Sequence, residues 1–376
     1  MIHARRDLSA LLTGDAAYLP LPDLDSNESS RLRAHLGVGE PIDDRCCLVV
    51  STSGTTGVPK GAMHTHDTLR ASAQATAEAL GGPGVWLQTL PPHHIAGLQV
   101  MLRSLAAGFD PVILDLTDGF DVTALPAAVD ALAGPRRYTS LVPVQLRKVL
   151  ADPDATAAMR QFDAILVGGA ATPPSLQQTA RDAGLQIVTT YGMSETAGGC
   201  VYNGIPLAGT TIRIDDADSD GVGRVVLGGA TVALGYRNLA DHPAFAEPGW
   251  FRTDDLGVVT DGALRIVGRA DEAISTGGLT VVPQVVEAVI VDLDAVTDCA
   301  VVGVPDERLG ERVVAVVVPA AGHDAPSVDE IREIVVERLD RYAAPREVVF
   351  VDALPLRGPG KVDRAALRDR LRQNTL

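Results

Sequence analysis

Short apolar runs alternate with helical stretches through the middle of the chain. The runs CCLVVST, DAILVGGA and QIVTTYGMS predict three strands, and each of them ends in a loop that contains glycine. The stretch HTHDTLRASAQATAEALGG predicts a helix that stops at Gly81, Gly82 and Pro83. Strands that alternate with helices indicate an α/β fold with a mostly parallel sheet covered on both faces. Ligands bind at the carboxyl ends of such strands, so the three loops predict one shared site.

The pattern changes after Gly223. The stretches GRVVLGGATVALGYRN and FRTDDLGVVTDGALRIVGR predict β-hairpin material with tight turns at Gly and Asp-Gly. A compact βα unit of about a hundred residues follows, within the usual range of domain sizes. Its helices are expected to begin at Pro283, after a capping box of Ser327 with Glu330, and after Asp363. We therefore expect a large domain over residues 1–269 and a small α+β domain over residues 270–376.

Composition narrows the class of protein. The 376 residues are 46% hydrophobic and carry a net charge of −16. Such an acidic chain argues against sequence-independent nucleic-acid binding and against docking on an anionic membrane, although a local site can still bind a small anion. The four cysteines form neither a disulfide framework nor a zinc pattern. The N-terminus is a poor signal peptide, and no apolar run reaches the ~18 residues of a membrane span. We expect a cytoplasmic protein.

The stretch STSGTTGVPKG, from Ser51 to Gly61, has the composition of an anion-binding loop. It is not a Walker A motif, because that motif ends in Gly-Lys followed by Ser or Thr. Its glycines permit close approach of the backbone to an anion, its hydroxyl groups can donate hydrogen bonds, and Lys60 adds a positive charge. Taken alone, the stretch also fits a polar surface loop.

Five further stretches follow this loop along the chain: LPPHHIAGL, YGMSETAG, GWFRTDDLG, GRADEAISTGGLTVVPQVVE and LPLRGPGKVDR. The six motifs, in this order from Ser51 to Arg364, resemble those of the adenylate-forming superfamily of acyl- and aryl-CoA ligases, adenylation domains and luciferase. The resemblance implies that a carboxylate attacks the α-phosphate of ATP, that pyrophosphate leaves and that an acyl-AMP remains. ATP and Mg²⁺ are then the expected cofactors, with CoA as co-substrate, and the small domain is expected to be mobile.

The resemblance also implies roles for individual residues. The catalytic residues are Lys361, Glu195 and His94. The residues expected at ATP or AMP are Thr52, Ser53, Gly54, Thr55, Thr56, Gly57, Lys60, Gly168, Gly169, Ala170, Tyr191, Gly192, Ser194, Asp255 and Arg269. Glu195 and Thr52 are expected at the metal, while His94, Ser140, Gly192 and Met193 are expected at the acyl pocket. Asp271 is the expected hinge, and Gly277 with Gly278 would line the passage for CoA.

Each of these roles has a plainer alternative. Lys361 also fits a solvated surface lysine, Arg269 a structural arginine at a domain junction, and His94 a core histidine. One position departs from the superfamily pattern, because Asp254 stands where a glycine is usual. That substitution places a second negative charge next to the carboxylate of Asp255, which is expected to accept hydrogen bonds from the ribose hydroxyls.

The acid substrate is narrowed by three features. Only fifty residues precede the glycine loop, the YGMSETAGGCVYNGIPL stretch is distinctive, and RRYTSLVPVQLRKVL lies where relatives build the acyl pocket. Together they resemble the short actinobacterial form of the o-succinylbenzoate–CoA ligases, acid–thiol ligases of menaquinone biosynthesis. Thr139, Ser140 or Gln145 could donate to the second carboxylate of such an acid, and Arg136 or Arg137 could supply charge.

Other functions stay open at this point. They are a CoA ligase for another aryl or acyl acid, a free-standing adenylation domain, and a non-catalytic nucleotide-binding protein. The expected partners are small molecules, with neither nucleic acid nor membrane insertion, and a homodimer is left open.

Overall fold

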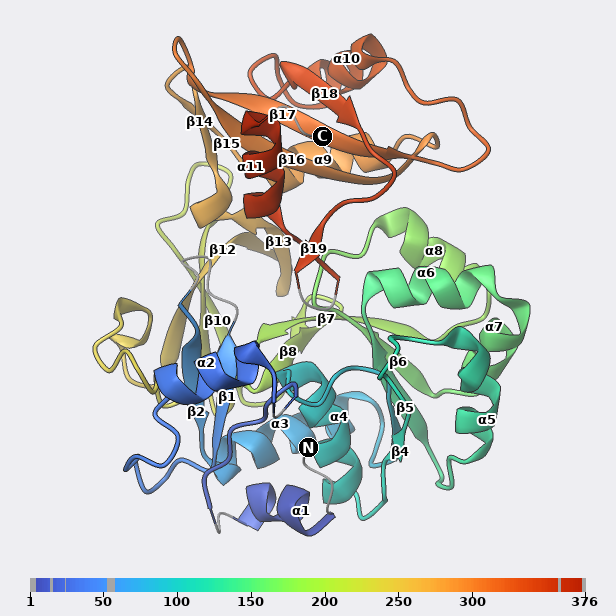
Figure 1. Cartoon of the computed structure of the whole chain (residues 1–376), viewed down its shortest axis with the longest axis vertical. Coiled ribbons are helices and arrows are strands. Elements are labelled where there is room, and N and C mark those ends of the chain that lie inside the picture. The colour runs from blue at the N-terminus through green and yellow to red at the C-terminus, as the bar shows by residue number, and fades with distance from the viewer. Residues whose placement is uncertain (1–4, 14–15, 24, 53–57, 358–359, 374–376) are drawn as a thin grey trace. The chain divides into compact units, whose positions relative to one another are not determined.

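The computed structural model describes residues 5–13, 16–23, 25–52, 58–357 and 360–373 (Figure 1). The chain forms two compact units. The first unit comprises Met1–Arg213, Val226–Thr253 and Thr260–Leu264, and the second comprises Ile214–Val225, Asp254–Val259 and Arg265–Leu376. The division into domains over residues 1–269 and 270–376 stays a prediction.

The first unit is built on a seven-stranded sheet in the order β4-β3-β5-β6-β7-β8-β9. Neighbouring strands from β4 to β7 are parallel, and β8 and β9 continue the sheet in antiparallel pairs. The expected α/β architecture is confirmed. The strands are β3 (Val85–Gln88), β4 (Val112–Ile113), β5 (Arg137–Leu141), β6 (Ala164–Val167), β7 (Ile187–Met193), β8 (Gly198–Tyr202) and β9 (Ile205–Pro206), and a separate hairpin contains β1 (Leu48–Thr52) and β2 (Lys60–His64).

Helices cover both faces of this sheet. Successive residues of a strand point to opposite faces, and here apolar residues point to both. In β3, Val85 and Leu87 face a core shared with α5 to α8, whereas Trp86 faces the opposite core. On that opposite side, α4 packs against β3 and α3. The helices of this unit are α1 (Arg5–Thr13), α2 (Asn27–His35), α3 (His66–Ala79), α4 (Ile95–Ala106), α5 (Leu125–Asp130), α6 (Pro143–Ala151), α7 (Pro153–Met159) and α8 (Pro174–Asp182).

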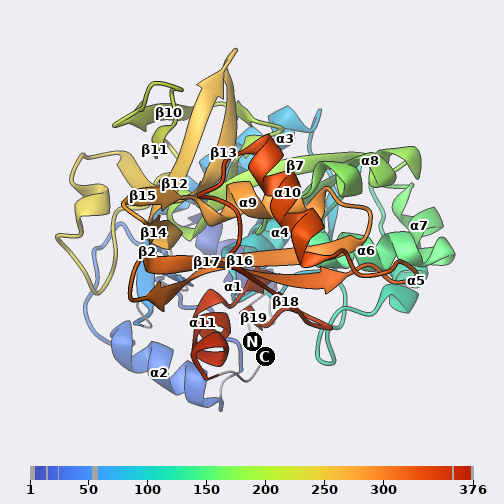
Figure 2. The same cartoon turned by 90° about the horizontal axis from the view of Figure 1, so that it is seen from above.

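The second unit contains a five-stranded sheet in the order β15-β14-β17-β16, with β18 paired to β17. Apolar residues of α9 and α10 cover one face, and Leu367 and Leu371 of α11 cover the other (Figure 2). The elements are β14 (Ile274–Thr276), β15 (Leu279–Val281), α9 (Pro283–Val291), β16 (Val296–Asp306), β17 (Gly310–Pro319), α10 (Val328–Arg338), β18 (Glu347–Phe350), β19 (Leu356–Arg357), β20 (Lys361–Val362) and α11 (Arg364–Arg372).

The two stretches predicted as hairpin material contain β11, β12 and β13. These strands form a four-stranded sheet with β10, in the order β10-β11-β12-β13, and segments of the sheet belong to each unit. Asp261 and Gly262 have positive φ angles of 52° and 79° between β12 and β13, as a tight Asp-Gly turn requires. The strands are β10 (Thr210–Asp215), β11 (Gly223–Gly229), β12 (Trp250–Thr260) and β13 (Ala263–Arg269).

Predicted helix starts agree with the structure. The Ser327 hydroxyl accepts from the Glu330 amide while the Glu330 carboxylate accepts from the Ser327 amide, which is the expected capping box. The Asp363 carboxylate caps α11 by accepting from the Ala366 amide. Pro283 begins α9.

The four cysteines are free and buried. Cys46, Cys47 and Cys200 lie in the first unit, and Cys299 lies in the second. Burial raises the pKa of the Cys47 and Cys200 thiols to about 12. None of the helices that the structure describes is long and apolar enough to cross a membrane.

Candidate active site

The glycine loop joins the two strands of the β1–β2 hairpin. Thr52 at the end of β1 pairs with Lys60 at the start of β2, so these two residues stand on either side of the loop. Ser53, Gly54, Thr55, Thr56 and Gly57 lie outside the described residues. On the β2 side, Asn238 holds the backbone next to Lys60: its Oδ1 accepts from the Gly61 amide at 3.2 Å, and its Nδ2 donates to the Pro59 carbonyl at 2.9 Å.

A second group of predicted residues follows β6 and β7, which are neighbours in the sheet. Gly168, Gly169 and Ala170 directly follow the carboxyl end of β6. A Cβ on Gly168 would lie 2.2 Å from the Thr190 hydroxyl, so only glycine fits there. Tyr191, Gly192 and Met193 end β7, and Ser194 and Glu195 follow in a short 3₁₀ turn, Ser194–Thr196. The structure thus brings these two expected segments together.

Gly192 is required by the close approach of β7 to β8. A Cβ at this position would lie 2.2 Å from the Gly198 carbonyl oxygen and 2.7 Å from the Gly199 Cα. These are backbone atoms, which cannot swing away as a side chain can. Met193 pairs with Gly198, so the end of β7 lies directly against the start of β8.

The Glu195 carboxylate is buried and oriented by a tyrosine from a distant segment. Glu195 is 7% exposed, and its Oε1 accepts a hydrogen bond of 2.6 Å from the hydroxyl of the buried Tyr236. Tyr236 belongs to a segment that runs along β2, with Met63 donating to the Gly235 carbonyl and Arg237 donating to the Gly61 carbonyl. The contact therefore connects β2 with the predicted Mg²⁺ ligand.

His64 makes a second connection between β2 and this segment. Its Nε2 lies 2.6 Å from the Ser194 carbonyl oxygen, to which a neutral ring can donate. Complete burial lowers the pKa of His64 to about 4, with the Ser194 carbonyl opposing that shift. Neither His64 nor Tyr236 could be predicted from the sequence, since no motif marks a residue whose contact depends on tertiary packing.

Lys60 is enclosed by the same segment. Its Nζ lies 3.1 Å from Nε2 of His242 and 5.1 Å from the centroid of the Tyr236 ring, within the range of a cation–π contact. The Tyr236 ring meets His242 edge-on, with 4.9 Å between centroids and an interplanar angle of 84°. Lys60 and Glu195 are thus both in contact with Tyr236.

His94 stands at the start of α4. It is the N-cap residue of the helix, and its ring lies 4.2 Å from that of His93. Burial disfavours the charged form of that neighbouring ring and lowers the pKa of His93. Ser140 is buried on β5, in the same sheet as β6 and β7.

Arg103, two turns further along α4, is a buried cation that none of the sequence motifs contains. It is 6% exposed, its Nε is buried without a hydrogen bond, and its guanidinium lies 5.3 Å from the Trp86 ring centroid. Within the described part of the chain it makes no hydrogen bond or ion pair. Three side chains spaced four residues apart on α4 lie against Gly198: Ile95, Gln99 and Arg103.

The second unit holds another group of predicted residues around Arg269. Its guanidinium bonds the carboxylate of Asp271 at 2.8 Å and 2.9 Å and that of the buried Asp255 at 3.3 Å. Burial disfavours the charged form, but the bonds to Asp271 and the charge of Asp255 raise the pKa of Arg269 above its usual value. The unusual Asp254 pairs with Arg224 at 2.9 Å, so a partner compensates the added charge.

The remaining predicted residues occupy two hairpins of the second unit. Gly277 and Gly278 form the two-residue turn between β14 and β15, with φ angles of 59° and 80°. Positive φ at both positions is typical of a type I′ turn. Lys361 is exposed at the start of β20, opposite Arg357 of β19.

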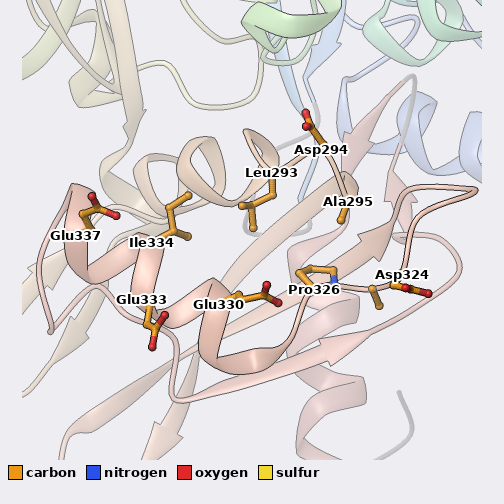
Figure 3. Close-up of a pocket in the computed structure, with 10 residues that line it drawn as sticks. Leu293, Asp294, Ala295, Asp324, Pro326, Glu330, Glu333, Ile334 and Glu337 are labelled. Carbon is orange, nitrogen blue, oxygen red and sulfur yellow. The ribbon is translucent and has the colours of Figure 1, made fainter.

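One pocket of about 520 Å³ lies elsewhere in the second unit, between α10 and the loop after α9 (Figure 3). Five carboxylates line it: Asp294, Asp324, Glu330, Glu333 and Glu337. Such a lining repels a phosphate chain, and none of the predicted site residues takes part in it.

Comparison with known proteins identifies the class. Residues 10–237 match the family model of AMP-binding enzymes, and residues 285–361 match that of the AMP-binding enzyme C-terminal domain. The chain belongs to the AMP-binding enzyme family, which confirms the expected membership. It is 53% identical to a probable 2-succinylbenzoate–CoA ligase of Mycobacterium tuberculosis strain H37Rv, over 94% of this chain and 91% of that protein.

Two other relatives show the breadth of the similarity. A feruloyl-CoA synthase of an Amycolatopsis species is 32% identical over 96% of this chain and 76% of that protein. The solved o-succinylbenzoate CoA synthetase of Bacillus subtilis, in complex with its acyl-adenylate intermediate, superposes with a TM-score of 0.72 at 27% identity. That match covers 87% of this chain and 69% of the other.

Proposed function

We propose that the chain is a 2-succinylbenzoate–CoA ligase (AMP-forming) of menaquinone biosynthesis. It activates one carboxylate of the diacid with ATP, releases pyrophosphate, and transfers the acyl group from AMP to CoA. The observation that carries this proposal is the 53% identity to a probable 2-succinylbenzoate–CoA ligase over nearly the whole of both chains. The enzyme acts in the cytoplasm, and its homodimerisation is to be decided by sedimentation.

The first unit supplies the phosphate and acyl sites in this proposal. The loop from Thr52 to Lys60 holds the β- and γ-phosphates, while Tyr191 and the segment Gly168–Ala170 border the adenine. The acyl group lies among His94, Ser140, Gly192 and Met193. The paired carboxyl ends of β6 and β7 support this arrangement, because they bring two of the segments together.

Mg²⁺ fits the residues expected to hold it. Glu195 offers a buried carboxylate and Thr52 a hydroxyl, both oxygen ligands of the kind that Mg²⁺ prefers. The described residues contain no cluster of three or more His, Cys, Asp or Glu that could bind a metal by themselves. Mg²⁺ is typically held by one or two carboxylates together with substrate phosphates, so a single glutamate suffices. When bound, the ion neutralises phosphate charge.

The second unit supplies the ribose contacts and the mobile lysine. Asp255 accepts hydrogen bonds from the ribose, and Arg269 fixes the orientation of Asp255. Lys361 stabilises the charge that develops when the carboxylate attacks the α-phosphate. Asp271 is the hinge of a lid domain over residues 270–376, and Gly277 and Gly278 line the passage for CoA. Glycines leave room there for a narrow chain.

Arg103 is the residue we assign to the second carboxylate of the diacid. Among the described residues, no carboxylate pairs with this buried cation; burial of an unpaired charge is costly, and a substrate carboxylate would offset that cost. Arg103 lies on the helix that begins after His94 and faces Gly198, which pairs with Met193. Arg136 and Arg137, considered from the sequence, lie at the amino end of β5, where Arg137 bonds Gln161. That is the end opposite to the expected site.

The assignment of Arg103 to the second carboxylate is tested by measuring the KM of the Arg103→Met variant for two acids, one with and one without that carboxylate. The KM for 2-succinylbenzoate is expected to rise by roughly tenfold or more, since a hydrogen bond to a charged group contributes ~1.5–3 kcal/mol. The KM for 4-oxo-4-phenylbutanoate, which lacks the ring carboxylate, is expected to stay unchanged. The control is Arg213→Met, which removes an arginine stacked on Trp250 at 4.6 Å. Equal losses with both acids would assign Arg103 a structural role.

The overall function is tested by incubating the purified protein with ATP, Mg²⁺, CoA and a panel of carboxylic acids, followed by mass spectrometry. We expect a CoA thioester of 2-succinylbenzoate. A thioester of a different acid would favour the alternative function, a ligase for another aryl acid, which the similarity to feruloyl-CoA synthase supports. Acyl-AMP without thioester would indicate a free-standing adenylation domain.

A further inference from the structure

Buried polar atoms without a hydrogen bond gather on α4 and on the strand against which it packs. Among the residues that the structure describes, six side chains have such an atom, and three of them belong to α4 or β3: Gln88, Gln99 and Arg103. The atoms are the amide oxygens of the two glutamines and Nε of the arginine. Buried polar groups are normally paired, so two acceptors and one donor without partners in one region need an explanation.

Gln99 and Arg103 complement each other on one face of α4. They are four residues apart, and residues with this spacing are neighbours on the surface of a helix. A long side chain on a helix extends towards the N-terminal end, so Arg103 extends towards the turn that contains Gln99. A Cβ on Gly198 would lie 3.5 Å from Cγ of Gln99 and 4.0 Å from Nη2 of Arg103. The unpaired acceptor and the unpaired donor thus belong to side chains that approach the same point.

The amide group of Gln99 has a fixed orientation. Its Nε2 donates to the Ala197 carbonyl at 2.8 Å, and the buried Ser72 hydroxyl donates to the same oxygen at 3.1 Å. Ala197 has a φ of 52° and a ψ of 35°, a left-handed conformation that residues other than glycine seldom adopt. Such a conformation persists where the surrounding contacts determine it. Because Nε2 is bound to this carbonyl, Oε1 is the atom of Gln99 that remains for another partner.

A guanidinium can bind a carboxylate with its two terminal nitrogens, and Nε–H then remains to donate elsewhere. Oε1 of Gln99 can accept that bond and fix the plane of the guanidinium, which lies 5.3 Å from the Trp86 ring centroid in the structure. We propose that Gln99 positions Arg103 for the second carboxylate of the acid, by accepting from Nε, and thereby determines the preference for a diacid. This inference rests on the proposed function, in which Arg103 binds that carboxylate.

Gln99→Met removes the acceptor and keeps the approximate size of the side chain. We expect kcat/KM for 2-succinylbenzoate to fall about tenfold, the scale of a lost hydrogen bond to a charged group. The value for 4-oxo-4-phenylbutanoate, which has no second carboxylate, is expected to stay unchanged. Gln99→Met also loses the bond to the Ala197 carbonyl. The matched control is therefore Ser72→Ala, which removes the other donor to that oxygen and should leave the ratio of the two acids unchanged.

A double variant shows whether Gln99 acts through Arg103. In an Arg103→Met background, Gln99→Met is expected to have no further effect on the ratio of the two acids, because the group that it positions is absent. Gln88→Met removes the other unpaired amide oxygen on this side of the sheet and should not change the ratio. A changed ratio in Gln88→Met but not in Gln99→Met would overturn the proposal.

The outcomes distinguish this inference from the proposed function. If the wild type forms no thioester of 2-succinylbenzoate, the proposed function fails. If Arg103→Met changes the ratio of the two acids and Gln99→Met does not, or lowers both values equally, Gln99 does not position Arg103. Should Gln99→Met not fold, a crystal structure of the wild type with 2-succinylbenzoate decides. We expect about 2.7–3.2 Å between Nε of Arg103 and Oε1 of Gln99, and a separation above about 3.5 Å would overturn the proposal.

Discussion

Glu195 shows how one side chain depends on a residue far along the chain. Tyr236 stands 41 positions later, yet its hydroxyl holds one oxygen of the buried carboxylate at 2.6 Å. A carboxylate fixed in this way presents its remaining lone pairs in one direction only. Outer partners of a metal ligand typically contribute 10–100-fold to metal affinity or activity.

Tyr236→Phe is therefore expected to raise the Mg²⁺ concentration needed for half-maximal adenylation by roughly tenfold. ATP binding in EDTA should change little, because the ring and its contacts with Lys60 and His242 are kept. The matched control is Tyr202→Phe, which also removes a buried tyrosine hydroxyl, here one that bonds Thr76 at 3.0 Å. If both variants change the Mg²⁺ requirement equally, the role of Tyr236 is general packing.

Lys361→Ala is expected to lower the rate of acyl-AMP formation by ~10²–10³-fold, the range found when one stabilising donor is removed. ATP binding should be largely kept, because Lys361 is exposed at the start of β20 and supports no core. Pyrophosphate release and calorimetric ATP binding measure the two quantities. Unchanged pyrophosphate release in this variant would remove Lys361 from the catalytic residues.

Motifs in the sequence predicted residues with a local signature and missed those defined by packing. Gly192 could be predicted from YGMSETAG because the motif is contiguous. The roles of Tyr236, His64 and Arg103 could not be predicted in this way. Each role depends on a contact with a residue that is distant in the sequence and close only in the folded chain. The partner of Asp254 was equally hidden, because Arg224 lies 30 positions away on another strand.

Among elements, β2 is joined to the turn after β7 through a histidine that must stay neutral. His64 has a pKa of about 4 in the folded protein, against 6.5 ordinarily. Below pH 6.5 the unfolded chain takes up a proton that the folded chain does not bind. The contribution of His64 to the free energy of unfolding is therefore constant above pH 6.5. The free energy of unfolding falls as the pH drops from 6.5 towards 4.

The loss attributable to His64 amounts to about 3 kcal/mol across that range, from ~1.4 kcal/mol per pH unit. We expect His64→Gln to flatten the pH dependence of unfolding between pH 4 and 6.5, whatever its effect at pH 7. Urea unfolding at several pH values measures this slope. An unchanged slope would mean that other groups dominate acid sensitivity. Exposed His35 provides the control substitution.

Element types and caps were predictable because their signals are local. The strands β1, β6 and β7, the start of α9 and the capping box of α10 all agree with the pattern of the sequence. The end of the sheet at which a residue lies follows from strand direction, and this excludes Arg136 and Arg137 from the expected site. The order of the strands depends on long-range pairing, which no local pattern specifies.

At the scale of the whole molecule, the two units have separate cores and separate determinants of stability. In the second unit, Arg364, whose side chain is only 12% exposed, joins three elements: its own helix α11, the 3₁₀ turn Ala270–Glu272 and α9. It bonds Glu272 at 2.8 Å and Glu287 at 2.5 Å. Removing one partner of a largely buried ion pair leaves the other charges uncompensated, which lowers the free energy of unfolding by ~3–5 kcal/mol.

Arg364→Met is expected to lower the unfolding free energy of the second unit by ~3–5 kcal/mol. The unfolding free energy of the first unit is expected to stay unchanged. The control is Arg338→Met in the same unit, which breaks an exposed pair with Asp292 and should cost no more than ~1 kcal/mol. Scanning calorimetry compares the variants. A uniform shift of the entire transition would show that the units unfold together.

The placement of the four buried thiols provides a way to observe the unfolding of each unit. Three of them lie in the first unit and Cys299 in the second, all shielded from solvent. An alkylating reagent that cannot reach them in the native protein will modify each one only when its surroundings open. Peptide mapping after brief exposure to iodoacetamide would then show when the surroundings of each cysteine open. The opening of each unit would be measured separately, with no engineered label.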